Sequence, residues 1–173
     1  MYKRFWLIGT LSLFLCGFVL HIAYESSGAA AWSLLVSGVN NSPWELVKPF
    51  AIVYMMWTFI ELSVLRPSLL HFVCARIISL LFFILSSLSV LSAVYLFIAE
   101  KWLSLAVLFV LTFISQALCN RLYASKCRFE LFWLPLIASV FVVLACILVF
   151  SFYPPTFVFF LDPVSHGYGM IQR

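Results

Sequence analysis

Long apolar stretches separated by short polar segments account for most of this chain. Each stretch reaches the roughly 20 residues that an α-helix needs to cross the hydrocarbon core of a bilayer. The pattern therefore predicts an all-α fold, an integral membrane bundle of five transmembrane helices that forms one membrane domain over residues 1–173. The expected spans are approximately 5–24, 43–65, 69–99, 102–124 and 130–152.

Polar residues and prolines mark where these helices are expected to end. Arg66-Pro67 closes the second helix, because proline disfavours helical geometry in the residue before it. Glu100-Lys101 makes a tight turn before the fourth helix, and Lys126-Cys127-Arg128 forms a basic loop before the fifth. The third stretch is about 46 Å long at 1.5 Å per residue, so we expect it to tilt or to project from the membrane.

Two segments are too short to span. Residues 25–42 are rich in Ser, Gly and Ala and are predicted to form a loop or a short helix at the membrane interface. Residues 153–173 form a C-terminal tail, in which Asp162-Pro163 and the glycines on either side of Tyr168 are turn formers. We expect an ordered tail that folds back over the outer end of the bundle. A frayed end is the alternative.

The first apolar stretch has a second interpretation. Lys3 and Arg4 precede it and Ala29-Ala30-Ala31 follows it, as in a secretory signal with a cleavage site. Its apolar run is longer than the roughly 7–15 residues of a typical signal core, so we interpret it as the first spanning helix.

The composition agrees with a membrane protein. Of the 173 residues, 65% are hydrophobic, 18% aromatic and only 9% charged, so a soluble globule would lack polar surface. The mean hydropathy is +1.15, and membrane lipids are the expected surroundings. The net charge of +4 does not indicate nucleic-acid binding, because the basic residues stand singly at the ends of apolar stretches. The five cysteines show no C-x-x-C pair, so neither a disulfide framework nor a zinc knuckle is predicted.

The basic residues predict the orientation of the bundle. With five spans, one side collects seven of them and the other collects three. The seven are Lys3, Arg4, Arg66, Arg76, Arg121, Lys126 and Arg128, and the three are Lys48, Lys101 and Arg173. Because cytoplasmic segments carry the excess of Lys and Arg, we expect the N-terminus in the cytoplasm and the C-terminus outside the cell membrane.

His21 and Glu25 stand near the predicted outer end of the first helix. They are four residues apart, so on a helix they share one face. Imidazole and carboxylate at this spacing suit a metal pair or a proton relay. An ion pair at a helix end is the structural alternative.

The start of the second helix concentrates polar chemistry. Ser42 to Glu45 reads S-x-x-E, a capping box with Pro43 at the first helical position, and Trp44 fits an interface anchor. Lys48 follows within the span, and Pro49 cannot donate to the carbonyl of Glu45. An intramembrane cation beside a freed carbonyl is a candidate site for a polar ligand.

Glu61 and Arg76 belong to the other half of the membrane, near the expected cytoplasmic ends of the second and third helices. They are expected to neutralise one another across the short connection between these helices, in a structural role.

Three polar patches form a pattern that extends across the chain. They are Leu20-His21 with Tyr24-Glu25-x-Ser27-Gly28, then Asn40-x-Ser42-x-Trp44-Glu45-x-x-Lys48, and then Pro154-Pro155 with Phe160-x-Asp162-Pro163 and Tyr168-Gly169. This pattern resembles a domain-of-unknown-function family of small multi-pass membrane proteins of the prokaryotic inner membrane, and the resemblance implies no particular activity. The family pattern has His where this chain has Leu46 and Thr156, so no metal site built on several histidines is expected.

Two functional hypotheses follow. In the first, an outer-face cavity binds a polar ligand or a lipid headgroup, in a membrane-embedded enzyme or a small transporter of unknown cofactor. Its candidate catalytic residues are His21, Glu25 and Lys48, and its candidate ligand-binding residues are Asn41, Trp44, Glu45, Asp162 and Tyr168. In the second, the protein is a noncatalytic subunit of a larger membrane complex. Serines at helical spacing, Ser79, Ser86, Ser89 and Ser92, offer a packing face for a neighbouring helix, in a membrane-protein partner or a homo-oligomer.

Overall fold

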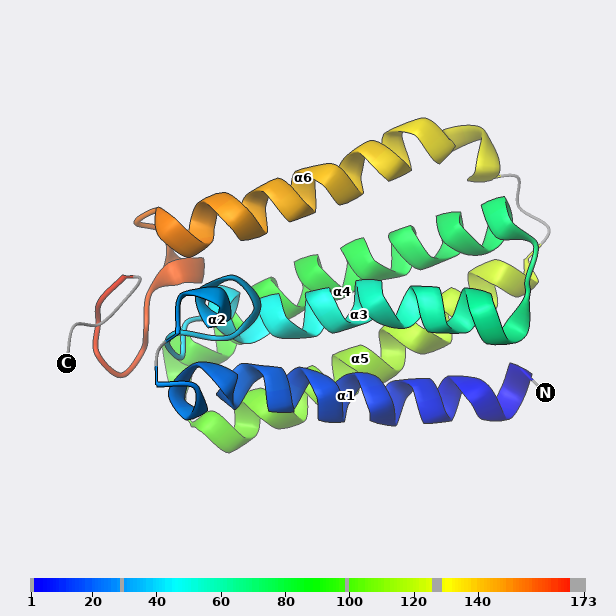
Figure 1. Cartoon of the computed structure of the whole chain (residues 1–173). Coiled ribbons are helices and arrows are strands. Elements are labelled where there is room, and N and C mark those ends of the chain that lie inside the picture. Colours follow the sequence, from blue (N-terminus) through cyan, green and yellow to red (C-terminus); the bar gives the residue numbers. More distant parts are fainter. Residues whose placement is uncertain (1, 29, 99, 126–128, 169–173) are drawn as a thin grey trace.

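The apolar stretches form helices that lie side by side (Figure 1). This computed structural model of the chain describes residues 2–28, 30–98, 100–125 and 129–168. Along the chain the elements are α1 (Tyr2–Ser26), α2 (Ala31–Val36), α3 (Pro43–Leu65), α4 (Leu69–Phe97), α5 (Lys101–Ala124), η1 (Phe129–Phe132), α6 (Trp133–Phe152) and η2 (Val158–Phe160). Within the described residues, five helices are long and apolar enough to cross a membrane. The predicted all-α, multi-pass bundle is confirmed.

The long helices alternate in direction, so the bundle has two ends (Figure 1). The end that carries α2, the start of α3 and η2 is termed the tail side, and the opposite end is termed the N-terminal side. α1 packs on α3 and α5, α3 packs on α4, and α4 packs on α5. α6 contacts α4, and it contacts α2 at the tail side. α3 and α4 are therefore central, and α6 covers one flank.

The helix ends are close to those predicted. α3 ends before Pro67, with Arg66 in the left-handed region at φ 45°. The last span differs, because a 3₁₀ turn, η1, precedes it and α6 begins at Trp133 rather than at Glu130. Pro135 explains the later start, since the first helical turn has no use for the N–H that proline lacks. Ala29 and the loop 126–128 lie outside the described residues.

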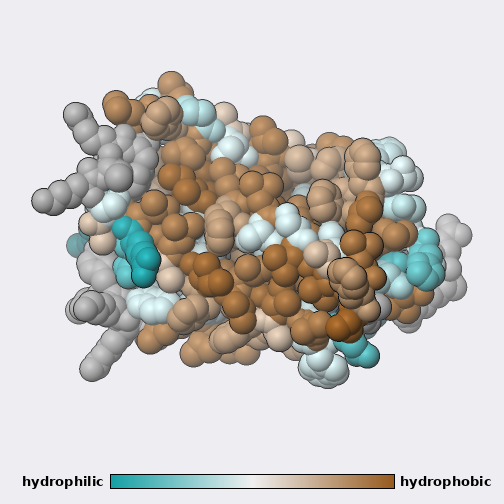
Figure 2. All heavy atoms as spheres, turned by 180° about the vertical axis from the view of Figure 1, so that it is seen from behind, coloured by the Kyte–Doolittle hydropathy of each residue, from teal (hydrophilic) through white to brown (hydrophobic). Residues whose placement is uncertain are grey.

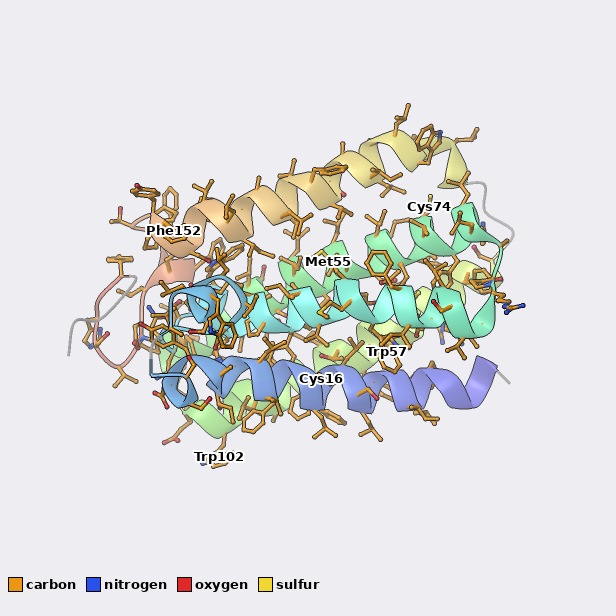
Figure 3. All side chains as sticks on the ribbon, viewed as in Figure 1. Cys16, Met55, Trp57, Cys74, Trp102 and Phe152 are labelled. Carbon is orange, nitrogen blue, oxygen red and sulfur yellow. The ribbon has the colours of Figure 1, made fainter. Side chains whose placement is uncertain are left out.

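Apolar side chains cover the outside of the bundle as well as its centre. Figure 2 shows a hydrophobic surface along the helices, with hydrophilic residues concentrated toward the two ends. Trp102, which is 77% exposed, projects at the tail-side start of α5, and Phe152 ends α6 on the same side (Figure 3). Exposed aromatic residues at these positions suit the boundary between hydrocarbon and headgroups. The outer surface is therefore suited to contact with membrane lipids.

Small polar residues allow α4 and α5 to approach closely. Ser79 of α4 and Ser115 of α5 are fully buried, and the Ser115 hydroxyl donates to the Ser79 carbonyl at 2.7 Å. Of the predicted serine face, Ser92 is also buried, whereas Ser86 is half-buried and Ser89 is exposed. Ser86 and Ser89 donate to carbonyls of their own helix. Only part of the serine face therefore takes part in helix packing within the bundle.

The C-terminal tail turns back onto the tail side. The Asp162 N–H donates to the Gly167 carbonyl at 3.0 Å, and Leu161 and Tyr168 form an antiparallel β-bridge. The ring of Phe160 lies 5.4 Å from the ring of Trp44 at the start of α3. The tail is therefore ordered as far as Tyr168, as expected, and Gly169 lies outside the described residues.

Candidate functional site

Glu45 and Lys48 form a buried ion pair at the tail-side start of α3. Their charged atoms lie 2.8 Å apart, and the two side chains are 7% and 0% exposed. The Lys48 ammonium also donates to the Leu34 carbonyl in α2 at 2.8 Å and to the Ser151 hydroxyl in α6 at 3.2 Å. An ammonium group has three N–H donors, and these three acceptors match them. Lys48 therefore joins α2, α3 and α6.

Half of the predicted capping box is present. The Ser42 hydroxyl accepts from the backbone N–H of Glu45 at 3.4 Å, and Pro43 occupies the first turn. The reciprocal bond was predicted wrongly, because the N–H of Ser42 donates to Asn40 Oδ1 at 2.9 Å. Asn forms such local bonds readily, and the Glu45 carboxylate instead accepts from the N–H of Val39 at 3.0 Å. Glu45 thus holds the loop before α3 as well as its ion pair.

His21 and Glu25 lie in different environments although they are four residues apart on α1. His21 is 6% exposed and packs against Gly38. A Cβ at Gly38 would clash with the His21 ring and lie 2.8 Å from the carbonyl oxygen of Glu45. Glu25, in contrast, is exposed. The structure therefore brings His21, but not Glu25, to the first turn of α3.

The other candidate ligand-binding residues are spread over the tail side. Trp44 is 7% exposed, and its ring packs edge-on against Phe150 of α6 at 5.5 Å. Phe160 of the tail also packs on the Trp44 ring, so the tail and α6 together cover this side chain. Three candidates remain. Asp162 is buried in the turn of the tail, Asn41 is half-buried, and Tyr168 is 40% exposed. The Asp162 carboxylate accepts from the N–H of Val164 at 2.8 Å and so stabilises that turn.

A second ion pair lies inside the bundle near the N-terminal side. Glu61 of α3 is paired with Arg76 of α4, which confirms the predicted neutralisation. Arg76 is 2% exposed and donates to Gln116 of α5 at 2.8 Å, while the Trp57 indole donates to Glu61 at 2.8 Å. The Arg76 guanidinium also lies 4.8 Å from the ring centroid of Tyr54, within the range of a cation–π contact. This polar network links α3, α4 and α5.

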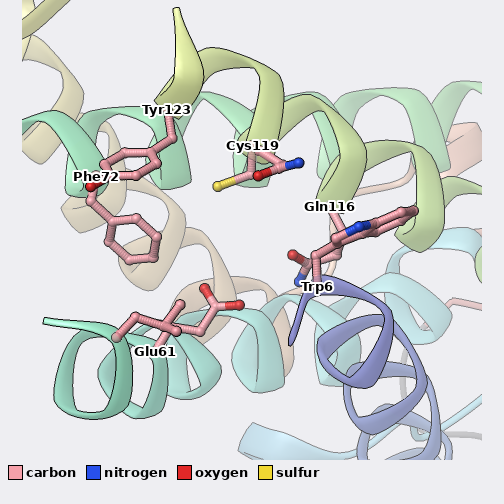
Figure 4. A pocket seen from close by; sticks show the side chains of 8 residues that line it. Trp6, Glu61, Phe72, Gln116, Cys119 and Tyr123 are labelled. Carbon is pink, nitrogen blue, oxygen red and sulfur yellow. The ribbon is translucent and has the colours of Figure 1, made fainter. Parts of the chain in front are cut away.

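A small cavity adjoins this network on the α1 and α5 side. Figure 4 shows Glu61 from α3, Gln116 and Cys119 from α5 and Trp6 from α1 around it. Its volume is about 30 Å³. Within the described structure, Gln116 Nε2 is buried without a hydrogen-bond partner. A cavity of this size has room for about one or two water molecules, which would satisfy such a group.

An apolar groove lies between α3 and α6, with α4 as its floor. Its volume is about 450 Å³, within the roughly 300–1,000 Å³ range of ligand pockets. Arg76, Ile77 and Leu80 form its floor and are buried. Phe59 on α3 and Phe141 on α6 form its rim and are 71% and 67% exposed. The groove therefore opens sideways, toward the lipid-facing surface of the bundle.

The structure shows no constellation of metal ligands in the part of the chain that it describes. No three His, Cys, Asp or Glu side chains among those residues come together as a metal ion would require. The described cysteines, Cys16, Cys74, Cys119 and Cys146, are free thiols.

Comparison with known proteins places the chain in a family. A family model described as "Family of unknown function (DUF6512)" matches residues 1–170. The chain belongs to this family. The match includes both ion pairs, the groove and the turn of the tail, so all of these features lie within the family domain. Searches of curated proteins and of solved structures gave no match.

The groove, Tyr54 and Gln116 of this DUF6512 member were not predicted from the sequence. Gln116 offered a usable signal, because a polar residue in the middle of an apolar span is costly unless it has a partner. The sequence contains no comparable signal for the groove. Its lining residues on α6, among them Ile137 and Phe141, stand in a helix that is apolar all round.

Proposed function

We propose that this protein is a noncatalytic membrane component that binds a membrane lipid, with one acyl chain in the groove between α3, α4 and α6. The observation that carries the proposal is the groove itself, with its volume of about 450 Å³ and its sideways opening. In a bilayer, lipid hydrocarbon chains surround such an opening. The atoms that line an empty apolar groove lose dispersion contacts, and an acyl chain in the groove would restore them. The buried floor gives the bound chain a fixed shape to fit.

The tail-side polar residues support a structural role for that end of the bundle. A group that binds a phosphate or activates a substrate needs a donor or a proton to offer. The ammonium of Lys48 has acceptors in Glu45, Leu34 and Ser151 for its three donors. Binding of a polar ligand by His21, Glu25 and Lys48 is the second hypothesis, and it requires Lys48 to give up at least one of these contacts.

We also propose that the N-terminal side faces the cytoplasm in a prokaryotic cell membrane. Arg76 and Lys48 are held within helices by ion pairs, and without them the basic residues still divide six against two in favour of the N-terminal side. The groove lies in the half of the bundle nearer that side, since its lining residues on α4 run from Val73 to Leu80. The bound lipid would then belong to the inner leaflet.

Lipid retention by two matched variants tests the proposal. Val140 lines the groove, whereas Val142 on the same helix is 61% exposed on another face. Val140→Trp fills the groove, and Val142→Trp adds the same ring to the lipid-facing surface. Native mass spectrometry from mild detergent measures the lipid that each protein retains.

We expect the wild type and Val142→Trp to retain about one lipid per protein, because the groove has room for a single acyl chain. We expect Val140→Trp to lose this lipid, because the indole ring occupies the groove. Equal retention by both variants would show that lipid binds elsewhere and would overturn the proposal. Unaltered melting temperature in detergent serves as the control for folding.

A further inference from the structure

The guanidinium of Arg76 has a donor that the protein does not use. Nη1 donates to Gln116 and Nη2 to Glu61. Nε is buried, and the described residues supply no hydrogen-bond partner for it. A buried N–H without an acceptor is costly, so an acceptor from outside the chain would stabilise it. Arg76 also lines the apolar groove. Because Nε is covered in this structure, an acceptor that enters the groove reaches it through a shift of the Arg76 side chain.

The charge around Arg76 indicates what kind of acceptor fits. Glu61 already neutralises the guanidinium, and the groove is otherwise lined almost entirely by apolar residues such as Val73, Ile77 and Leu80. An anionic group would face the Glu61 carboxylate and would have to lose its hydration. A neutral carbonyl oxygen adds no charge and still satisfies the N–H.

The position of Arg76 along α4 agrees with the depth of lipid ester groups. α4 has 29 residues, about 43 Å at 1.5 Å per residue, against a hydrocarbon core about 30 Å thick. A centred helix then projects about 6 Å at each end. Arg76 is seven residues beyond Leu69, about 10 Å along the helix and so about 4 Å inside the hydrocarbon boundary. This depth lies within the length of an arginine side chain of the boundary, where ester carbonyls lie.

We propose that the groove selects an ester-linked lipid, whose carbonyl oxygen accepts a hydrogen bond from Arg76 Nε while the acyl chain below it fills the groove. Lining residues nearer the membrane centre, such as Ile52 and Leu144, contact the lower part of that chain. This inference rests on the proposed lipid-binding function and adds the chemical class of the lipid.

Competition between two lipids tests the inference. Purified protein is equilibrated with equal amounts of ester-linked and ether-linked phosphatidylcholine of identical chain length, and native mass spectrometry measures which is retained. The ether lipid carries CH₂ in place of each carbonyl and differs in nothing else. We expect about a tenfold excess of the ester lipid on the wild type, as for the loss of one hydrogen bond. Equal retention would overturn the inference and leave chain binding intact, whereas retention of neither would overturn the proposed function as well.

A paired variant checks that Arg76 is the source of the preference. Glu61→Gln together with Arg76→Met removes both charges and leaves neither buried alone. We expect the lipid that this variant retains to have an ester-to-ether ratio near one. A persistent ester preference in a folded double variant would place carbonyl recognition elsewhere and would overturn the inference.

Discussion

The ammonium of Lys48 lies 3.2 Å from the hydroxyl of Ser151, although 103 residues separate the two along the chain. The contact joins the start of α3 to the end of α6. Trp44, Phe150 and Phe160 pack together at the same place. The tail side is therefore closed by a charged contact and by an aromatic cluster, and both involve the first two turns of α3.

Removal of the Lys48 charge is expected to destabilise the protein. Lys48→Met leaves Glu45 as a buried carboxylate without its cation, and breaking such a pair costs about 3–5 kcal/mol. Thermal unfolding in detergent, followed by tryptophan fluorescence, measures the loss. The double variant Glu45→Gln/Lys48→Met should lose less, because no lone charge stays buried. Wild-type stability of Lys48→Met, together with a lost cellular phenotype, would instead favour the polar-ligand hypothesis.

The Glu61–Arg76 pair is expected to show strong coupling in a double-mutant cycle. Glu61→Gln or Arg76→Met alone leaves one charge buried in the bundle and should cost about 3–5 kcal/mol. The double variant should be more stable than the sum of the two losses predicts. Melting temperatures of the four proteins in one detergent give the coupling. Additive losses would mean that the two residues do not depend on one another for stability.

Gly38 is expected to reject a side chain. Gly38→Ala places a methyl group against the His21 ring and 2.8 Å from the Glu45 carbonyl oxygen, and overpacking of this kind costs about 1–3 kcal/mol. Gly167→Ala is the matched control, because the nearest atom to a Cβ there is Ser165 Oγ at 3.5 Å. His21→Ala in the Gly38→Ala background should recover part of the loss. Equal melting temperatures for the two alanine variants would contradict the close packing at Gly38.

Thiol labelling of single cysteines is expected to place the two sides of the bundle in different compartments. Ser125→Cys reports on the N-terminal side and Val164→Cys, at a position 68% exposed, reports on the tail. In a variant without native cysteines, an impermeant maleimide should label residue 164 in intact cells and residue 125 only after permeabilisation. The reverse pattern would invert the orientation, and labelling of both in intact cells would contradict five spans.

Local chemistry explains which features could be predicted from the sequence. The helix end at Arg66, the Ser42 cap and the Glu61–Arg76 pair depend on residues close together in the chain, and the structure has all three. The Lys48–Ser151 contact does not. Serine is common within these spans, so nothing local identifies the one that Lys48 reaches.

The groove could not be predicted from the sequence, for a different reason. In a soluble protein the apolar face of a helix indicates which side is buried. Here α6 is apolar on nearly every side, and its buried Ile147 does not differ in character from the aliphatic residues that it exposes. The burial of Trp44 could not be predicted either, because an aromatic residue near a membrane boundary has the same sequence context whether or not a tail packs on it.

The separation of Glu61 and Arg76 on successive helices has a consequence for biogenesis. Glu45 and Lys48 neutralise one another within a single turn, so the early part of α3 can leave the translocon with its charges matched. Glu61 has no such neighbour on α3, and a lone charge released into lipid costs about 2.5–3.5 kcal/mol on insertion scales. Its counter-ion arrives 15 residues later. α3 and α4 are therefore suited to enter the bilayer together, as one hairpin.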